Sequence, residues 1–332
     1  MAKITVMMAA YNVEPYLARA LDSILVQTFR DFDVIIVNDG SSDATGDICD
    51  EYAGKDSRIH VIHQKKSGVC ITRNSCLDWA SQCSDSQWII FVDSDDWIHP
   101  EMLERMLRAA EENHVRICAC GYQATTGEEP VIDPKTLVPE VWKTMDFYMT
   151  HYTNAIMACC KLYEKSCYGS VRHPVKNCGY DDEFATHQVL YGEEYMVVIP
   201  APLYAYYTNP QSLTKNDWSP RMLQAWDAYE EQLLFFRERG ETELVNFRYR
   251  GYLENALDNY RRASEAPDEP EILAARKRIY KKIRQLIRRM RRQECLDYRL
   301  DFDVILAFYP LRTRIYRLAR ETWERLRGGQ NA

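Results

Sequence analysis

The chain has 332 residues, of which 46% are hydrophobic, and its formal net charge is −7 at pH 7. This length and composition exclude general disorder and allow one large domain or two moderate ones. The eleven cysteines are odd in number and form no C-x-x-C pair, which favours reduced, buried thiols in a cytoplasmic protein over a disulfide framework.

The first 122 residues alternate short apolar strands with amphipathic helices, the pattern of a parallel sheet built from βαβ units. The first strand follows the N-terminus without a secretory signal pattern. No apolar run approaches the roughly 20 residues that a membrane-spanning helix needs. Strands are predicted at residues 3–9, 33–37, 59–62, 88–92 and 115–122, with a helix in each interval.

The fourth of these strands, residues 88–92, ends in Asp93, Asp95 and Asp96. If the chain stays extended there, Asp93 and Asp95 point the same way, roughly 6.6 Å apart. Two such charges repel by roughly 2.5 kcal/mol at an effective dielectric near 20. A divalent cation removes that penalty, and Mg²⁺ and Mn²⁺ prefer carboxylate oxygens. Acid clusters also occur as solvated turns, but open α/β sheets bind ligands at the carboxyl ends of their strands, so we predict a metal and phosphate site.

Polar motifs follow the other strands as well, at residues 10–12, 38–39 and 68–74. In a doubly wound sheet these strand ends converge on one crevice. Neither G-x-G-x-x-G nor G-x-x-x-x-G-K-[ST] occurs in the chain. Dinucleotide oxidoreductases and P-loop NTPases are therefore disfavoured.

The second half of the chain begins with a Pro- and Glu-rich connecting loop at residues 127–139. After it, the pattern predicts shorter elements and then a helical region from residue 216 onward. We expect a helix at 142–152, an element at 158–163, a helix opened by residues 179–184, strands at 197–199 and 203–207, and helices at 222–238 and 247–263.

The C-terminal region is strongly basic. Residues 271–332 carry 17 Lys and Arg against 7 Asp and Glu, a net charge of +10, whereas the first 270 residues carry −17. The acidic body argues against nucleic acid as a partner. Residues 276–292 and about 311–326 are predicted to form basic helices, each with one apolar face. Either these faces pack on the protein, or the helices anchor it to an anionic membrane surface; both interpretations stay open.

With these motifs placed, the chain resembles family 2 glycosyltransferases of the GT-A fold, especially bacterial enzymes of capsule, exopolysaccharide or cell-wall glycan synthesis. The resemblance covers about residues 4–215. It rests on an ordered set of motifs: Met8-Ala-Ala-Tyr-Asn-Val-Glu14, Val37-Asn-Asp-Gly-Ser-Ser-Asp43, Gly68 with Arg73-Asn74, Phe91-Val-Asp-Ser-Asp-Asp96, Lys161-Leu-Tyr163, Tyr180-Asp-Asp-Glu-Phe184 and Pro202-Leu-Tyr-Ala-Tyr206.

The resemblance implies an α/β GT-A fold, Rossmann-like, with a mostly parallel central sheet flanked by helices. Its catalytic domain would span residues 1–215, with a nucleotide-sugar half at 1–122 and an acceptor half at 123–215. A helical extension would follow at 216–332. The location would be cytoplasmic, with peripheral contact to the inner face of the cell membrane as an alternative.

The activity implied is an inverting transfer of a hexose or N-acetylhexosamine from a UDP-sugar to a glycan or lipid-linked acceptor, assisted by Mn²⁺ or Mg²⁺. The metal ligand would be Asp95. The residues that would contact the nucleotide-sugar are Ala10, Tyr11, Glu14 and Asp39 at the base and ribose, Arg73 at the nucleotide or diphosphate, and Asp93 and Ser94 at the donor.

The acceptor hydroxyl must lose its proton as it attacks, which requires a positioned base. The resemblance places this base at Asp182, with Asp181 beside it where the family usually has Glu. Asp96, Trp97 and His99 are candidate acceptor contacts, although Trp97 could equally pack in the core.

Simpler interpretations stand beside these roles. Asp39 could only cap a helix, Arg73 could form a surface ion pair, and Asp182 could be a carboxylate favoured at a helix N-terminus. A metal-ligating His187 is less expected than a structural helix histidine.

Two other functions are compatible with the pattern. A sugar nucleotidyltransferase can share the sheet and carboxylates, but the chain lacks a Gly-rich, basic NTP-binding loop near the N-terminus. A non-catalytic membrane-surface scaffold with a GT-A domain would fit the basic tail, but the retained Asp93, Asp95 and Asp182 speak against it.

Overall fold

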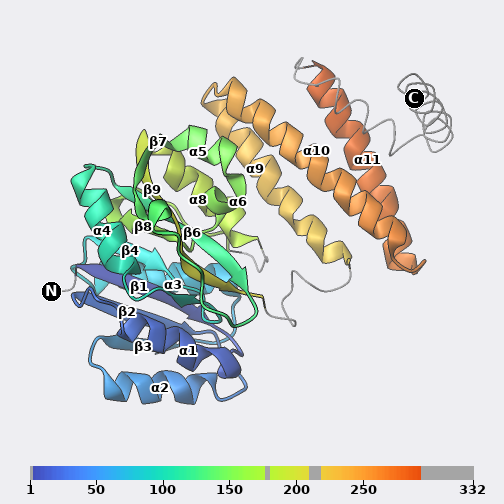
Figure 1. The fold of residues 1–332 in the computed structure, drawn as a ribbon. Coiled ribbons are helices and arrows are strands. Elements are labelled where there is room, and N and C mark those ends of the chain that lie inside the picture. The colour runs from blue at the N-terminus through green and yellow to red at the C-terminus, as the bar shows by residue number, and fades with distance from the viewer. Residues whose placement is uncertain (1–2, 176–179, 209–217, 293–332) are drawn as a thin grey trace, which may run out of the picture. The chain divides into compact units, whose positions relative to one another are not determined.

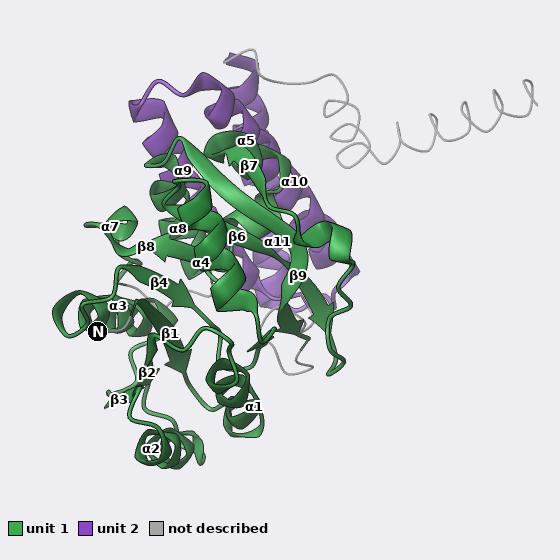
Figure 2. Cartoon of the chain, turned by 60° about the vertical axis from the view of Figure 1, so that its left-hand side comes forward, with its two compact units in different colours: residues 1–215 green, residues 216–332 purple. Residues whose placement is uncertain are grey.

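The computed structural model describes residues 3–175, 180–208 and 218–292. The chain divides into two compact units, residues 1–215 and residues 216–332, which Figure 2 shows in green and purple. No helix in the described ranges is both long and apolar enough to cross a membrane.

Nine strands of the described part of unit 1 form one sheet, in the order β3-β2-β1-β4-β8-β6-β9-β5, with β7 paired to β9 (Figure 1). Strand β1 pairs in parallel with β2 and β4, and β2 pairs in parallel with β3. This is the parallel region predicted from the first four apolar runs. The strands are β1 (Ile4–Ala10), β2 (Phe32–Asn38), β3 (Ile59–His63), β4 (Trp88–Phe91), β5 (Trp97–Ile98), β6 (Ile117–Thr125), β7 (Glu140–Lys143), β8 (Lys161–Glu164) and β9 (Tyr195–Tyr207).

The sheet departs from a simple βαβ series after β4. Strand β8 lies between β4 and β6 and runs antiparallel to both. The strand expected at 115–122, β6, therefore runs in the same direction as β4 but is not its neighbour. Neighbours in a sheet are selected by long-range pairing, which local spacing does not record.

Two further boundaries differ from the predictions. The two short strands expected at 197–199 and 203–207 are one strand, β9, whose register on β6 shifts around Gly121. Proline interrupts the strand pattern there, and a Cβ at Gly121 would lie 2.3 Å from the Pro200 carbonyl oxygen. The helix expected from residue 142 begins only at Thr144, because Trp142 belongs to β7.

The helices of unit 1 form where apolar residues recur at helical spacing. In α1, Leu17, Leu21 and Ile24 are buried, and Pro15 occupies the first turn, where its missing N–H is not needed. Burying each such side chain stabilises the fold by roughly 1.5–3 kcal/mol. The helices are α1 (Glu14–Leu25), α2 (Thr45–Lys55), α3 (Val69–Gln82), α4 (Met102–Glu112), α5 (Thr144–Thr150), α6 (Tyr152–Ile156), α7 (Lys165–Tyr168) and α8 (Asp181–Tyr191), with a 3₁₀ turn η1 (Pro134–Leu137).

Unit 2 is helical in its described part, as predicted, with η2 (Pro220–Gln224), α9 (Ala225–Glu238), α10 (Thr242–Glu265) and α11 (Pro270–Arg292). Helix α10 contacts both α9 and α11. The apolar face of α11 is buried; its members are Ile272, Ala275, Ile279, Ile283, Leu286 and Met290. That face is therefore not available for insertion into a membrane. The second basic helix, expected near residues 311–326, lies outside the described residues.

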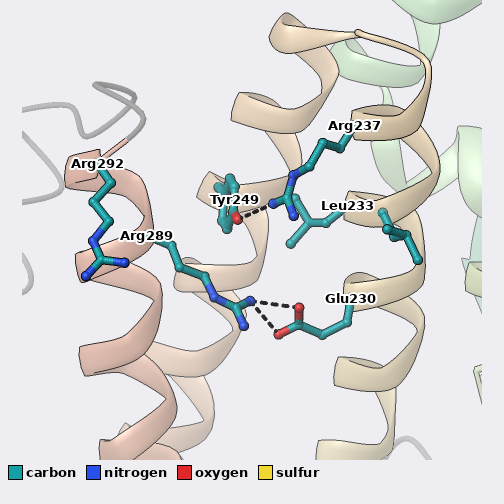
Figure 3. A pocket seen from close by; sticks show the side chains of 7 residues that line it. Glu230, Leu233, Arg237, Tyr249, Arg289 and Arg292 are labelled. Carbon is teal, nitrogen blue, oxygen red and sulfur yellow. Dashed lines mark hydrogen bonds and ion pairs between the residues drawn. The ribbon is translucent and has the colours of Figure 1, made fainter.

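Charged side chains hold α9 and α11 together around a cavity of about 640 Å³ in unit 2 (Figure 3). Nη1 of Arg289 donates to the two carboxylate oxygens of Glu230 at 3.0 and 2.8 Å, and Nζ of Lys282 donates to the same carboxylate at 3.1 Å. Nη2 of Arg237 donates to the Tyr249 hydroxyl at 2.7 Å, which joins α9 to α10. These basic residues therefore have partners within unit 2.

Candidate functional site

Arg73, on α3, lies among three carboxylates at the carboxyl end of β4. Its side chain is 7% exposed, and its three nitrogens each meet a different residue: Nη2 lies 3.0 Å from Asp93, Nε 2.8 Å from Asp181 and Nη1 3.5 Å from Asp182. Burial alone would lower the pKa of Arg73, but the charges of these carboxylates outweigh burial and raise it well above its usual value. A permanently charged guanidinium thus joins the end of β4 to the start of α8.

The carboxylates around Arg73 are themselves perturbed. Burial raises the pKa of Asp181 to about 8 against the opposing charge of Arg73, and burial likewise raises the pKa of Asp93. One guanidinium faces three carboxylates, so the site holds an excess of negative charge when all three are ionised. A further cation would stabilise such a group.

The acid cluster forms a turn instead of the extended segment expected from the sequence. The backbone N–H of Asp96 donates to the Asp93 carbonyl at 3.2 Å, and Ser94 and Asp95 occupy the turn. The extended geometry was wrong because Asp and Ser favour tight turns at strand ends. Burial, and after it the charge of Asp93, raises the pKa of Asp95 to about 6, so the two carboxylates still repel each other.

This acidic turn fits a divalent cation in the chemistry of its donors. No group of three or more His, Cys, Asp and Glu side chains in the described part of the chain is arranged to hold a metal by itself. Protein sites for Mg²⁺ commonly supply one or two carboxylates and leave the remaining positions to substrate phosphates and water. Asp95, with Asp93 nearby, could supply these one or two carboxylates.

Asp39, at the carboxyl end of β2, organises the neighbouring loop. Its Oδ1 accepts hydrogen bonds from the Ser67 N–H at 2.8 Å and from Gln64 Nε2 at 2.7 Å, while Oδ2 accepts from the Gly68 N–H at 2.8 Å. Burial would raise the pKa of Asp39, but these hydrogen bonds lower it below its usual range. Gly68 has φ +96°, a conformation that favours glycine. Asp39 is 3% exposed, and its contact with a nucleotide stays a prediction.

The residues expected beside Asp39 lie at the same sheet edge. The Ala10 carbonyl accepts a hydrogen bond from the Asp39 N–H at 2.9 Å. Tyr11 is 38% exposed, its hydroxyl contacts the Lys66 ammonium, and that ammonium lies 4.0 Å from the ring centroid. Glu14 accepts a hydrogen bond from the Ala44 N–H at 3.0 Å. An exposed aromatic ring therefore stands at this edge, with backbone and charged groups around it.

The candidate acceptor residues are mostly enclosed. Asp96 is 1% exposed and accepts hydrogen bonds from the Tyr204 hydroxyl and the Tyr207 N–H, both at 2.7 Å. Trp97 is 3% exposed, whereas His99 is half-buried, and burial lowers its pKa. Asp96 and Trp97 thus hold β5 against β9 in this structure, and their contact with an acceptor stays a prediction.

Sequence reasoning missed His173. Its side chain is fully buried, Nδ1 lies 3.3 Å from the Asp181 carbonyl oxygen, and the ring meets Phe91 edge-on at 6.0 Å. Burial, and then the charge of Arg73, lower the pKa of His173 to about 4, so the ring is neutral near pH 7. No spacing pattern pointed to this histidine.

Asn74 was quoted only as part of a motif, but its role is visible in the structure. Its amide donates to the His173 carbonyl and accepts from the His173 N–H, both at 2.9 Å. Two neighbouring residues of α3 therefore contact the chain around the start of α8: Asn74 binds the backbone of His173, and Arg73 contacts Asp181 and Asp182. His187 is 1% exposed within α8, as a structural histidine would be.

Arg19, which no motif included, contacts the acid cluster at Asp95. Its guanidinium carbon lies 3.7 Å from the Trp97 ring centroid, and Nη2 donates to the Asp95 carbonyl at 3.4 Å. A guanidinium stacked on an aromatic ring is stabilised by the cation–π attraction. This contact places the positive charge of Arg19 beside Asp95, in addition to the charge of Arg73 beside Asp93.

Comparison with known proteins agrees with this geometry. The model of the family described as "Glycosyl transferase family 2" matches residues 5–169. Glycosyltransferase GlyA of Streptococcus pneumoniae is 30% identical over 272 residues, which cover 77% of this chain and 38% of GlyA. The chain therefore spans about two fifths of that relative's length. EpsH of Bacillus subtilis, provisionally named a glycosyltransferase, is 30% identical over 72% of this chain and 71% of its own.

Solved structures show the same fold at low sequence identity. Staphylococcus aureus TarS (residues 1–349), solved with UDP-GlcNAc, has a TM-score of 0.60 and 18% identity over 88% of this chain and 92% of that chain. The mannosyltransferase PcManGT of Pyrobaculum calidifontis, solved with GDP-Man and Mn²⁺, has a TM-score of 0.52 and 12% identity over 93% and 87%. The expected α/β fold of the GT-A type, with helices after it, is confirmed.

Proposed function

Because the chain belongs to glycosyl transferase family 2, we propose that it is an inverting glycosyltransferase that moves a hexose or N-acetylhexosamine from a UDP-sugar to a glycan or lipid-linked acceptor. The observation that carries this proposal is the shared contact of Arg73 with Asp93 on one side and with Asp181 and Asp182 on the other. It brings a candidate donor-side carboxylate and a candidate base to one guanidinium.

The donor would lie along the carboxyl ends of β1 and β2. The exposed ring of Tyr11 can stack on the base, and Ala10, Glu14 and Asp39 surround the ribose position. TarS has been solved with UDP and with UDP-GlcNAc, which supports a nucleotide-diphosphate sugar as donor for this fold. Asp93 and Ser94 would then face the sugar and its diphosphate.

Asp95 would hold Mn²⁺ or Mg²⁺ together with the diphosphate, supported by the Mn²⁺ found with PcManGT. When bound, such an ion stabilises the negative charge that develops on the leaving nucleotide. Arg73 itself is occupied by three carboxylates, so we assign it the task of positioning them, and its predicted contact with the nucleotide remains open to test.

Asp182 is the better candidate for the base of the two neighbouring aspartates. Its side chain is 24% exposed, against 10% for Asp181, and its contact with Arg73 is longer. The acceptor oxygen forms a bond to the anomeric carbon while its proton passes to Asp182. The bond from the anomeric carbon to the diphosphate oxygen breaks, and its electron pair leaves with UDP. Asp181 holds Arg73 in place.

The test is turnover of UDP-sugars with added Mn²⁺ or Mg²⁺, read as UDP release and as transfer. Asp182→Asn should keep UDP binding and lower transfer by about 10²–10⁴-fold, the usual contribution of a positioned base. Asp95→Asn should remove the gain in UDP affinity that metal gives over chelator. Asp78→Asn, on the same helix as Arg73 but exposed, is the control and should behave as the native protein.

Two outcomes would overturn the proposal. An Asp182→Asn protein that transfers sugar at the native rate would exclude Asp182 as the base. Release of pyrophosphate from a nucleoside triphosphate and a sugar phosphate would instead indicate a nucleotidyltransferase.

We also propose a cytoplasmic location, supported by the free thiols among the described cysteines, which persist in a reducing compartment. Any contact of α11 with an anionic membrane surface would use its charged face, because its apolar face is buried.

A further inference from the structure

Unit 1 contains a cavity of about 400 Å³ that shares no residue with the site described above. It lies where β7, α5 and α6 meet β6 and β9. The residues that give it chemical character are Glu140 and Trp142 on β7, Phe147 on α5, His151 between α5 and α6, and Asn154 on α6. A pocket of this size can enclose a small organic ligand.

Three aromatic rings form one wall of this cavity. The Trp142 and His151 ring centroids are 5.2 Å apart with an interplanar angle of 88°, and those of Phe147 and His151 are 5.0 Å apart. Trp142 also meets Phe147 edge-on at 5.8 Å. Phe147 is buried, whereas Trp142 is half-buried and His151 is exposed. The three rings therefore form a row that leads from the core to the surface.

Two polar side chains accompany the rings. The Glu140 carboxylate accepts one hydrogen bond from Trp142 Nε1 at 3.2 Å and, as a carboxylate, can accept several more. The amide nitrogen of Asn154 donates to the Cys120 carbonyl at 2.9 Å. In the described part of the chain, the amide oxygen of Asn154 is buried without a hydrogen-bond partner, a costly arrangement unless a ligand or water supplies a donor.

We propose that this cavity binds one pyranose unit of a neutral glycan. A pyranose has apolar C–H faces that pack on aromatic rings and hydroxyls that donate to carboxylate and amide oxygens, the two kinds of group present here. An anionic ligand fits poorly, because Glu140 is acidic and none of the residues lining this cavity is Lys or Arg.

The cavity and the proposed base lie on helices that contact each other: α6 carries Asn154, and α8 begins at Asp181. The Asn154 carbonyl accepts a hydrogen bond from the buried ammonium of Lys161, and burial lowers the pKa of Lys161 while the charge of Asp182 is among those that raise it. Lys161 thus contacts the backbone of a residue that lines the cavity. That the bound unit belongs to the acceptor glycan rests on the proposed function, whereas sugar binding itself does not.

The test is fluorine NMR of the full chain, in which the tryptophans are replaced by 5-fluorotryptophan. The resonance of Trp142 is the one that is missing from the spectrum of Trp142→Phe. The protein is titrated without any donor with N,N′-diacetylchitobiose, cellobiose and maltose, up to tens of millimolar. We expect at least one disaccharide to shift the Trp142 resonance with saturation. Glu140→Gln should weaken this binding about fivefold or more, in line with the loss of one hydrogen bond to a charged group.

Val141→Ala is the matched control, because Val141 is the intervening residue of β7, points to the opposite face and is 53% exposed. It should bind as the native protein does. No shift with any of the three sugars, or equal weakening by Glu140→Gln and Val141→Ala, would overturn the proposal. A saturable shift in a protein that turns over no UDP-sugar would leave the sugar site standing and remove the proposed function instead.

Discussion

The Nε atom of Arg73 lies 2.8 Å from Oδ2 of Asp181, although the two residues come from helices in opposite halves of unit 1. Through the same guanidinium, Asp181 is connected to Asp93, which lies 3.0 Å from Nη2. A planar guanidinium can meet several carboxylates in fixed directions, which an ammonium cannot do. One buried side chain therefore connects Asp93, after β4, with Asp181, at the start of α8.

Replacing this side chain should damage both stability and transfer. Arg73→Gln removes the guanidinium that contacts three partly buried carboxylates, and breaking a buried ion pair in this way costs about 3–5 kcal/mol. We expect a loss of that size in the free energy of unfolding, measured by urea denaturation, together with loss of transfer. Arg172→Gln, which removes an exposed pair with Asp78 at 3.2 Å, should cost less than about 1 kcal/mol; equal losses in the two variants would contradict the role of Arg73.

His173 predicts a pH dependence of stability. Its pKa is about 4 in the folded protein and about 6.5 when unfolded. Between these values the unfolded chain binds the proton and the folded chain does not, so the stability due to His173 is complete above pH 6.5 and is lost as the pH falls through 4. The loss amounts to at most about 3 kcal/mol.

The measurement is the free energy of unfolding of the native protein and of His173→Gln from pH 7.5 to pH 4. The native protein should lose more stability on acidification than the variant does. If the two stability curves run parallel over the whole pH range, His173 is protonated as readily in the folded protein as in the unfolded chain. That result would contradict the pKa expected from its burial and from the charge of Arg73.

The packing of α11 is testable in the same way. Ile283 is fully buried, so Ile283→Ala should lower the stability of unit 2 by about 2–5 kcal/mol through lost burial and the cavity left behind. Leu273→Ala, at a position 41% exposed on the same helix, should have a much smaller effect. If Ile283→Ala left thermal unfolding in solution unchanged, the apolar face of α11 would not be packed within the protein.

Much of the site was predictable because its residues follow strands. The apolar runs that form β1, β2 and β4 end in Ala10, Asn38 and Phe91, and parallel pairing of these strands brings their ends to one edge. Asp39 follows β2 directly, and Asp93 follows β4 after Val92. Their conformations were less predictable. The side chain of Asp39 bonds to the loop after β3, which is distant in sequence. Asp93 begins a turn, because local hydrogen bonds compete with the extended geometry assumed from strand spacing.

The sequence by itself determined the alternation of strands and helices, the acidic residues at the strand ends and the apolar face of α11, because periodicity and burial preference are local properties. Only the tertiary structure decided that β8 enters between β4 and β6, that Arg73 meets Asp181, and that His173 is buried behind them. These contacts join residues far apart in the chain, and such pairings are selected by the packing of the whole sheet and its helices, which no single stretch of sequence records.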